Sequence, residues 1–275
     1  MSVTLRFLGS AAAEAIPGIF CDCEVCRQAR KLGGKDIRMR TSYMIDQSLV
    51  VDMGPDTIRQ MQRFDCDAGK IRHIMLTHMH NDHFVSWEFN RRPAERRTAE
   101  LCVYGTEKCG KQFVQQAFHG READMLKRGF RFVVLCNYAR TRIATNISVT
   151  AIPATHNMSV PGTAMLYIIE KRKKRVFIGN DSGTLCPEAE KFLSSYPDRI
   201  NAAIVDCTFG TRTMGTGHQG GEKCLRTFEL FKYTENAAKV VNHFSHNCGS
   251  NHAGLEEYFN PKGVMVGYDG MKLEL

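Results

Sequence analysis

The chain has 275 residues, of which 43% are hydrophobic and 24% are charged, and its formal net charge is +8. This balance is typical of a soluble globular protein and excludes a disordered chain, a collagen-like fibre and a coiled coil. The longest uncharged apolar runs, such as residues 164–169, are far shorter than the about 20 residues that a membrane-spanning helix needs. We therefore expect no membrane partner.

Short β-type runs alternate with longer amphipathic stretches along the whole chain. The predicted strands are residues 3–8, 41–45, 48–51, 71–76, 101–104, 130–135, 147–151, 164–169, 176–178, 202–205, 239–242 and 264–266. The predicted helices are residues 56–64, 107–116, 187–195 and 222–233. Strands in the first half mostly follow one another through short turns, which argues against a uniform βαβ order. The pattern predicts an α/β sandwich of two largely antiparallel or mixed sheets, formed by one domain over residues 1–275.

Two basic runs supply much of the positive charge, residues 91–97 (RRPAERR) and 171–175 (KRKKR). A basic balance is compatible with phosphorylated substrates or nucleic acid. We interpret both runs as solvated loops. The second lies between two apolar segments, so it is expected at a hairpin tip, far from any chemistry at the other end of the strands.

The chain contains eleven cysteines, and its first residues lack the basic and apolar regions of an export signal. This combination predicts free thiols in a reducing compartment and hence a cytoplasmic location. Eight of the cysteines are scattered singly and are interpreted as ordinary buried or surface residues. The other three are clustered near the N-terminus.

A histidine-rich segment follows the predicted strand at residues 71–76. It places His78, His80, Asp82 and His83 within six positions of one another. Imidazole is costly to bury without partners, so such a cluster beside an apolar strand indicates a metal site. In an extended segment His78 and His80 project to one side, and Asp82 and His83 follow one turn later. One segment can therefore serve two ions, which two-metal hydrolases hold roughly 3.5–4 Å apart.

This segment resembles the H-x-H-x-D-H hallmark of the metallo-β-lactamase superfamily. The resemblance implies an αβ/βα sandwich of two mixed β-sheets with outer helices and a metal centre between the sheets. It also implies three further ligands after later strands, and His156, Asp181 and His243 occupy such positions. By resemblance, His78, His80 and His156 bind one divalent ion, Asp82, His83 and His243 bind a second, and Asp181 bridges both. Such a ligand set accepts zinc, manganese or iron.

Two further aspartates are candidates for orienting ligand histidines. Asp52 occupies the early D-x-G position of the superfamily, after the strand at residues 48–51. Asp206 ends the strand at residues 202–205. Either carboxylate could instead serve only as a helix cap or a turn residue.

Three thiols cluster at Cys21, Cys23 and Cys26. A redox pair needs only two thiols, so three favour a soft metal site, and a closed zinc site needs a fourth ligand. His246 is the first candidate for this fourth ligand and Cys248 is its competitor.

The C-x-C-x₂-C element narrows the resemblance to the PhnP-like branch, the phosphoribosyl cyclic phosphodiesterases. In that branch three cysteines and a histidine hold a structural zinc, which here implies Cys21, Cys23, Cys26 and His246 in an insertion at about residues 18–35. The implied reaction is hydrolysis of a small cyclic phosphodiester, such as phosphoribosyl 1,2-cyclic phosphate in phosphonate catabolism. A related protein of pyrroloquinoline quinone biosynthesis shares the cysteine element but typically lacks the complete catalytic set.

His218 is the candidate general acid, since it lies in a glycine-rich loop at residues 215–221 and the resembling enzymes carry a catalytic histidine in this interval. The alternative is a flexible surface loop with an incidental histidine. Two other functions stay open: a phosphodiesterase or nuclease acting on RNA or DNA, and a non-catalytic binding protein of cofactor biosynthesis. We expect a small phosphorylated substrate and no nucleic-acid partner, because the chain has no long basic arm. A homodimer stays open.

Overall fold

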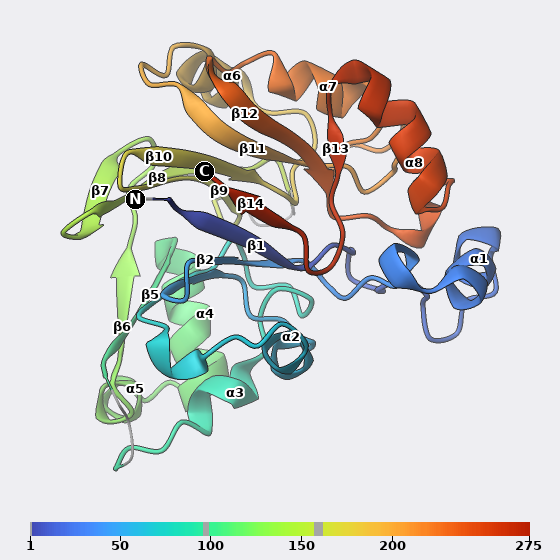
Figure 1. Ribbon diagram of the computed structural model, residues 1–275. Coiled ribbons are helices and arrows are strands. Elements are labelled where there is room, and N and C mark those ends of the chain that lie inside the picture. Colours follow the sequence, from blue (N-terminus) through green and yellow to red (C-terminus); the bar gives the residue numbers. More distant parts are fainter. Residues whose placement is uncertain (1, 96–98, 157–161) are drawn as a thin grey trace.

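Two seven-stranded mixed sheets face each other in the computed structural model, which describes residues 2–95, 99–156 and 162–275 (Figure 1). The strand order of the first sheet is β14 (Lys272–Glu274), β1 (Thr4–Gly9), β2 (Ser42–Ile45), β3 (Leu49–Val51), β4 (His73–Met75), β5 (Leu101–Gly105) and β6 (Phe130–Val134). The order of the second is β13 (Met265–Val266), β12 (Tyr233–Asn242), β11 (Ile200–Asp206), β10 (Lys174–Gly179), β9 (Met165–Lys171), β8 (Ile147–Pro153) and β7 (Arg140–Ala144).

Each sheet has an antiparallel half and a parallel half. Strands β3 to β6 run parallel in the first sheet, and β10 to β13 run parallel in the second. Strand β8 has the same direction as β10, because both are antiparallel to β9. Parallel strands end at one edge of a sheet, so the loops after β4, β8, β10, β11 and β12 come together at the mouth of the sandwich.

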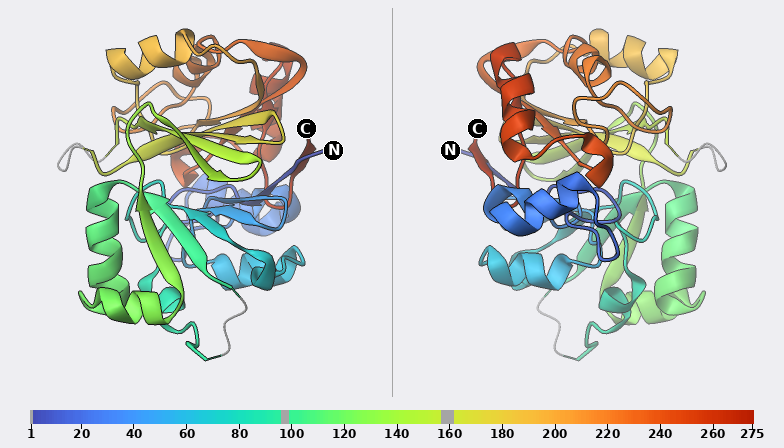
Figure 2. Two further views of the ribbon diagram at one scale, coloured as in Figure 1. Left: turned by 90° about the vertical axis from the view of Figure 1, so that its left-hand side faces the viewer. Right: turned by 90° about the vertical axis from the view of Figure 1, so that its right-hand side faces the viewer.

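Helices cover the outer face of each sheet (Figures 1 and 2). The outer layer of the first sheet consists of α2 (Thr57–Arg63), α3 (Ser86–Asn90), α4 (Glu107–Phe118) and α5 (Glu122–Lys127). The second sheet is covered by α6 (Pro187–Ser194), α7 (Glu222–Phe228) and α8 (His252–Phe259), with α1 (Glu24–Leu32) packed at its end. This α/β sandwich confirms the predicted fold class.

The core between the sheets is built by alternation along the strands. In β1, Leu5 and Phe7 point between the sheets, whereas Leu8 packs against the outer helices. Tyr43 from β2 and Tyr167 from β9 fill the same interlayer and are fully buried. Each large apolar side chain buried in this way contributes about 1.5–3 kcal/mol, and the alternation fixes the register of the strands.

The twelve predicted strands and four predicted helices are present, with one correction. The helix expected over residues 222–233 ends at Phe228, and Tyr233 begins β12. The chain leaves the helix because Phe231 packs on Phe177, with ring centroids 4.7 Å apart, and Tyr233 pairs with Ile200. Tertiary contacts thus override the local helical pattern.

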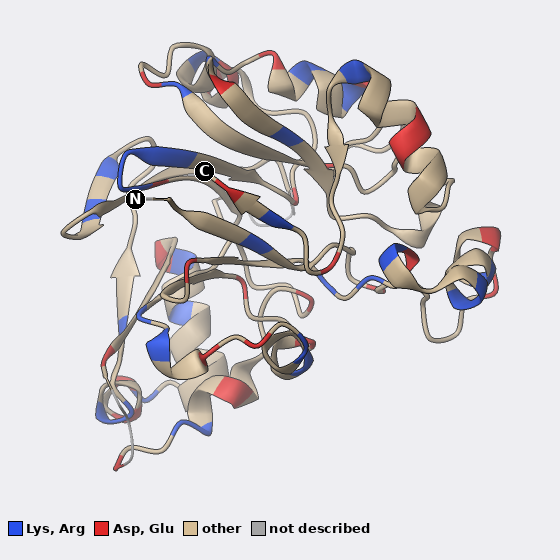
Figure 3. Ribbon diagram, in the orientation of Figure 1, with Lys and Arg blue, Asp and Glu red and all other residues tan. Residues whose placement is uncertain are grey.

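The basic run at residues 171–175 contains a hairpin tip, as predicted, but it is not a solvated loop throughout, because Lys171 ends β9 and is buried against Asp46. Arg172 and Lys173 make the turn between β9 and β10, both with positive φ. Figure 3 shows this basic turn beside the basic strand β7. The other basic run is only partly described, because residues 96–98 lie outside the described ranges; residues 91–95 are irregular. Within the described ranges, no helix combines the length and apolarity needed to cross a bilayer.

One glycine fixes the distance between the two loops that follow β3 and β4. A Cβ atom on Gly54 would lie 1.9 Å from the carbonyl oxygen of Asp82. We predict that Gly54→Ala destabilises the fold by about 1–3 kcal/mol, because a backbone segment must move. Chemical denaturation measures this, with Gly217→Ala as the control, since a Cβ there meets no atom within 4 Å. Equal stabilities of the two variants would contradict the packing argument.

Candidate active site

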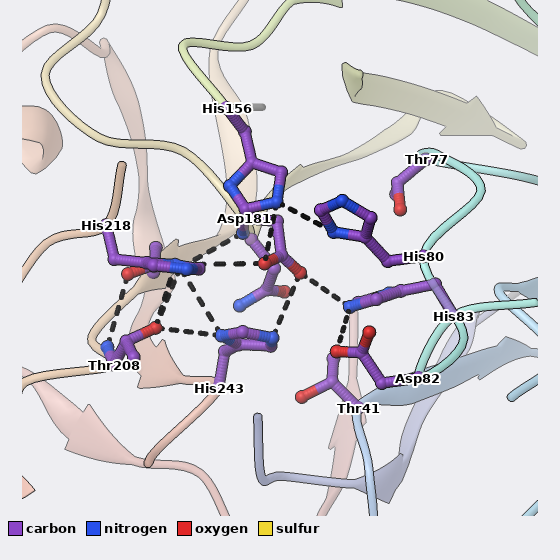
Figure 4. A network of polar contacts seen from close by, with 12 residues as sticks. Thr41, Thr77, His80, Asp82, His83, His156, Asp181, Thr208, His218 and His243 are labelled. Atoms are coloured by element: carbon purple, nitrogen blue, oxygen red, sulfur yellow. Dashed lines mark hydrogen bonds and ion pairs between the residues drawn. The ribbon is translucent and has the colours of Figure 1, made fainter. Parts of the chain in front are cut away.

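Seven of the predicted ligands converge at the mouth of the sandwich, each from a loop that follows a strand. Figure 4 labels all of them except His78. Three residues at these strand ends have left-handed backbone conformations: Asp52 (φ 62°), Asp181 (φ 55°) and His243 (φ 68°). Such conformations are rare for residues other than glycine and cluster at functional sites. They turn the chain sharply at the strand end, so the side chains of these residues face the mouth.

The first cluster consists of His78, His80 and His156. His78 Nε2 lies 2.9 Å from His80 Nδ1, and His156 Nε2 lies 3.1 Å from the same atom. Burial lowers the pKa of His78 well below its ordinary value and also lowers that of His156. Both rings are therefore held neutral, which is the form that binds metal ions.

The second cluster consists of Asp82, His83 and His243. His83 Nε2 lies 3.1 Å from Asp82 Oδ2 and 2.6 Å from Asp181 Oδ2, and His243 Nε2 lies 2.9 Å from the same Asp181 oxygen. Burial alone would lower the pKa values of both histidines. The surrounding carboxylates, Asp181 foremost, instead raise the pKa of His83 well above its ordinary value and that of His243 to about 10.

Asp181 lies between the two clusters. Its Oδ2 faces His83 and His243, and its Oδ1 lies 3.8 Å from His156 Nε2. Although burial opposes its ionisation, the His243 and His83 imidazoles hold the pKa of Asp181 well below its usual range. A carboxylate placed in this way can offer one oxygen to each of two ions.

These donors fit divalent metal ions. Buried His83 Nε2, Asp181 Oδ2 and His243 Nε2 make no hydrogen bond among the described residues, although both nitrogens lie within ion-pair distance of the Asp181 oxygen. In the histidine cluster the separations approach the roughly 3.3 Å expected between nitrogens on one tetrahedral zinc, given bonds of about 2.0–2.1 Å. A cation would replace the protons that His83 and His243 otherwise hold.

Asp52 holds the histidine-rich loop in place. One carboxylate oxygen accepts from the backbone N–H of Thr77 at 2.8 Å. The other accepts from the Thr77 hydroxyl and pairs with His83 Nδ1, both at 2.7 Å. The contact at Nδ1 leaves Nε2 of His83 directed at Asp181. These contacts support the orienting role of Asp52 in metal binding, which stays a prediction.

Asp206 holds the loops that carry Asp181 and Gln219 in place at the end of the second sheet. Its carboxylate accepts from the backbone N–H groups of Asp181 and Gln219, at 3.0 and 2.8 Å. It also lies 3.1 Å from His218 Nδ1 and 3.4 Å from His243 Nδ1. Despite full burial, hydrogen bonds to these histidines lower the pKa of Asp206 to about 2.

His218 lies in this site and not on an unrelated surface loop. Its Nδ1 is 3.7 Å from Asp181 Oδ1, and its ring centroid is 4.9 Å from that of His156. The side chain retains 25% of its exposure, so the ring borders solvent. Burial would lower its pKa, but the hydrogen bond to Asp206 and the charges of Asp206 and Asp181 raise it above the ordinary value.

The three clustered cysteines meet His246 and not Cys248. His246 Nδ1 lies 2.9 Å from Cys21 Sγ and 3.6 Å from Cys26 Sγ, and the four candidate ligand atoms lie within 4.8 Å of one another. Cys248 points into the core beneath the second sheet. Burial raises the pKa of Cys26 to about 12, so this thiol stays protonated unless a cation binds it.

The remaining histidines have structural partners or lie on the surface. His73 pairs with the Tyr104 hydroxyl, and buried His252 lies between Arg38 and Glu256. His119 ends α4 in a left-handed conformation. The sequence analysis missed Gln219, which donates to the carbonyl of Gly183 and so joins the loops that carry His218 and Asp181. Its only sequence signal is its position next to His218.

The contacts of Asp52 generate a prediction about metal affinity. We expect Asp52→Asn to weaken metal binding at the His/Asp site about 10–100-fold, because the charge that orients His83 is lost. Competition with a chromogenic chelator measures this. Asp46→Asn is the matched control, since Asp46 pairs with Lys171 at 2.7 Å and touches none of the ligands. An Asp52→Asn protein that retains wild-type affinity would contradict the role of Asp52.

Similar solved structures cover nearly the whole chain. A diphosphatase from the PhnP family aligns with a TM-score of 0.78 and 22% identity, over 100% of this chain and 98% of that one. Zn²⁺-bound PqqB from Methylobacterium extorquens aligns with a TM-score of 0.75 and 16% identity, over 99% and 100%. The short form of human tRNase Z aligns with a TM-score of 0.63 and 16% identity, over 98% of each chain.

No curated protein sequence matches the chain. The family model of the β-lactamase superfamily domain matches residues 47–244, more than two thirds of the sequence. This range contains the histidine-rich loop, His156, Asp181 and His243, on which the resemblance to the superfamily depended. The residues of the narrower resemblance, Cys21, Cys23, Cys26 and His246, lie outside it. The chain belongs to the β-lactamase superfamily.

Proposed function

We propose that this protein is a metal-dependent phosphodiesterase that hydrolyses a small cyclic phosphodiester, such as phosphoribosyl 1,2-cyclic phosphate. The observation that carries the proposal is the position of Asp181 between two separate groups of candidate ligands. A bridging carboxylate keeps two cations close, and paired cations suit a phosphate, which offers two non-bridging oxygens. The similarity to a PhnP-family diphosphatase supports phosphate chemistry.

The chain's own residues would hold three ions. His78, His80 and His156 would hold the first, Asp82, His83 and His243 the second, with Asp181 shared. Zinc and manganese are the first candidates for this pair and iron is the third, since His/Asp ligation accepts all three. When bound, the ions supply Lewis acidity and lower the pKa of a water toward neutrality. Cys21, Cys23, Cys26 and His246 would hold a structural zinc, since thiolates favour that ion.

In the proposed reaction a bond forms between a water oxygen and phosphorus, and the bond from phosphorus to a sugar oxygen breaks. The departing alkoxide is strongly basic and needs a proton. His218 suits this step because Asp206 engages its Nδ1 at 3.1 Å, which leaves Nε2 as the proton donor. The raised pKa of His218 favours the protonated form that a general acid needs.

Nucleic acid is the alternative substrate, favoured by the net charge of +8 and by the similarity to human tRNase Z. The basic hairpin formed by β9 and β10 argues against this role. Its turn is at the end of β9 where β10 begins, whereas the ligand Asp181 follows the opposite end of β10. A binding role in cofactor biosynthesis is the other alternative, favoured by the similarity to PqqB.

Turnover of a phosphodiester panel by the metal-loaded protein separates these functions. We expect hydrolysis of ribose cyclic phosphate and bis-p-nitrophenyl phosphate, and loss of both activities in Asp181→Ala with the fold retained. Cleavage of RNA that falls steeply with salt would favour the nuclease instead, because several phosphate contacts produce such a slope. Absence of turnover with every metal would favour the binding protein.

The proton-donor role of His218 predicts a dependence on the leaving group. His218→Ala should slow hydrolysis of ribose cyclic phosphate about 10²–10⁴-fold, the usual contribution of general acid catalysis. It should slow bis-p-nitrophenyl phosphate much less, because p-nitrophenolate leaves without a proton. Metal content is the control and should be unchanged. Equal losses on both substrates would make His218 a binding residue, and no loss on either would remove it from the reaction.

A further inference from the structure

The geometry assigns Glu14 as the carboxylate that positions His246 in the cysteine-rich metal site. This inference rests on the structural zinc site proposed above and not on the reaction. Glu14 lies in the loop between β1 and α1, close in sequence to the cysteines but outside any metal-ligand motif. Its carboxylate lies on the side of His246 that faces away from the thiols.

The two ring nitrogens of His246 have different surroundings. Nδ1 faces the sulfur atoms, 2.9 Å from Cys21 Sγ and 3.6 Å from Cys26 Sγ. Nε2 lies 3.4 Å from Glu14 Oε1. If Nδ1 binds zinc, Nε2 must carry the proton, and a histidine ligand usually directs that N–H to a carboxylate, carbonyl or water. Glu14 is the group placed to accept it.

The position of Glu14 is itself fixed from the segment that carries His246. The Ser245 hydroxyl donates to the same Oε1 atom. The loop of Glu14 also pairs with this segment through its backbone, since Ala12 N donates to Phe244 O and Phe244 N donates to Ser10 O, both at 2.9 Å. These contacts therefore hold the Glu14 carboxylate beside the His246 ring.

This arrangement links the two metal sites. His243 and His246 are separated by two residues, and Ser245 N donates to the carbonyl of Thr208 at 3.0 Å. Thr208 Oγ1 in turn lies 2.9 Å from His243 Nδ1. A zinc bound by His246 would therefore anchor one end of residues 243–246. The other end of this segment carries His243, a ligand of the His/Asp site.

Cobalt loading isolates the cysteine site, because only a thiolate-bound cobalt has a sulfur-to-metal charge-transfer band. Release of cobalt to a chelator is followed through this band in the wild type, Glu14→Gln and Glu14→Ala. We expect Glu14→Ala to lose affinity about 10–100-fold, the usual cost of removing such a partner. The cobalt affinity of Glu14→Gln, which keeps an acceptor oxygen, should lie between those of the wild type and Glu14→Ala.

Asp22→Ala is the matched control. It removes a carboxylate from the same loop, but Asp22 is 82% exposed and pairs only with Arg27 and Arg30 among the described residues, at 3.6 and 3.7 Å. The role of Glu14 would be overturned if Glu14→Ala released cobalt as the wild type does. It would also be overturned if Asp22→Ala accelerated the release as much as Glu14→Ala. If Glu14→Ala fails to fold, the comparison of Glu14→Gln with the wild type decides in the same way. A wild type without the charge-transfer band would overturn the metal site itself, whatever the protein hydrolyses.

Discussion

The mutual position of Asp181 and the histidines around it is the constraint on which the structure of the site depends. Five imidazoles and two carboxylates from four loops meet at the mouth of the sandwich, and most of them are buried. Such a group of buried polar atoms is unfavourable unless charges compensate one another. Without metal, protons on His83 and His243 balance Asp181 and Asp82. Metal ions would balance the same carboxylates and would also use the ring nitrogens of His78, His80 and His156.

Two aspartates at strand ends allow this convergence. Asp52 follows β3 and binds the loop after β4, whereas Asp206 ends β11 and binds the loops after β10 and β12. Each carboxylate contacts a backbone N–H and the Nδ1 atom of a ligand histidine. In each sheet, one buried carboxylate therefore fixes both the path of a loop and the orientation of a ligand histidine ring. Since each aspartate has several partners, the loss of either should disturb several loops together.

The ligands could be predicted from the sequence because they are close to one another in it or follow obvious strands. His78, His80, Asp82 and His83 belong to one segment, so their spacing alone indicates a metal site. Glu14 and Gln219 could not be found in this way. Glu14 meets His246 only because β1 and β12 end at the same edge of the sandwich, and Gln219 reaches Gly183 from another strand end.

The elements missed by the sequence analysis have a similar explanation. Helix α1 has nine residues and begins directly after Cys23, inside the cysteine-rich segment that the sequence analysis interpreted only as a metal-binding insertion. Strand β7 is an edge strand whose arginines alternate with intermediate positions, and β14 has only three residues. Such elements are stabilised by their neighbours more than by their own sequence.

The central claim is that two ions share Asp181. Anomalous diffraction from crystals of the metal-loaded protein, recorded at the absorption edge of each metal, tests it most directly. Our account predicts two peaks roughly 3.5–4 Å apart, with the Asp181 carboxylate between them. A single peak held by one cluster alone, or two peaks without Asp181 between them, would contradict it.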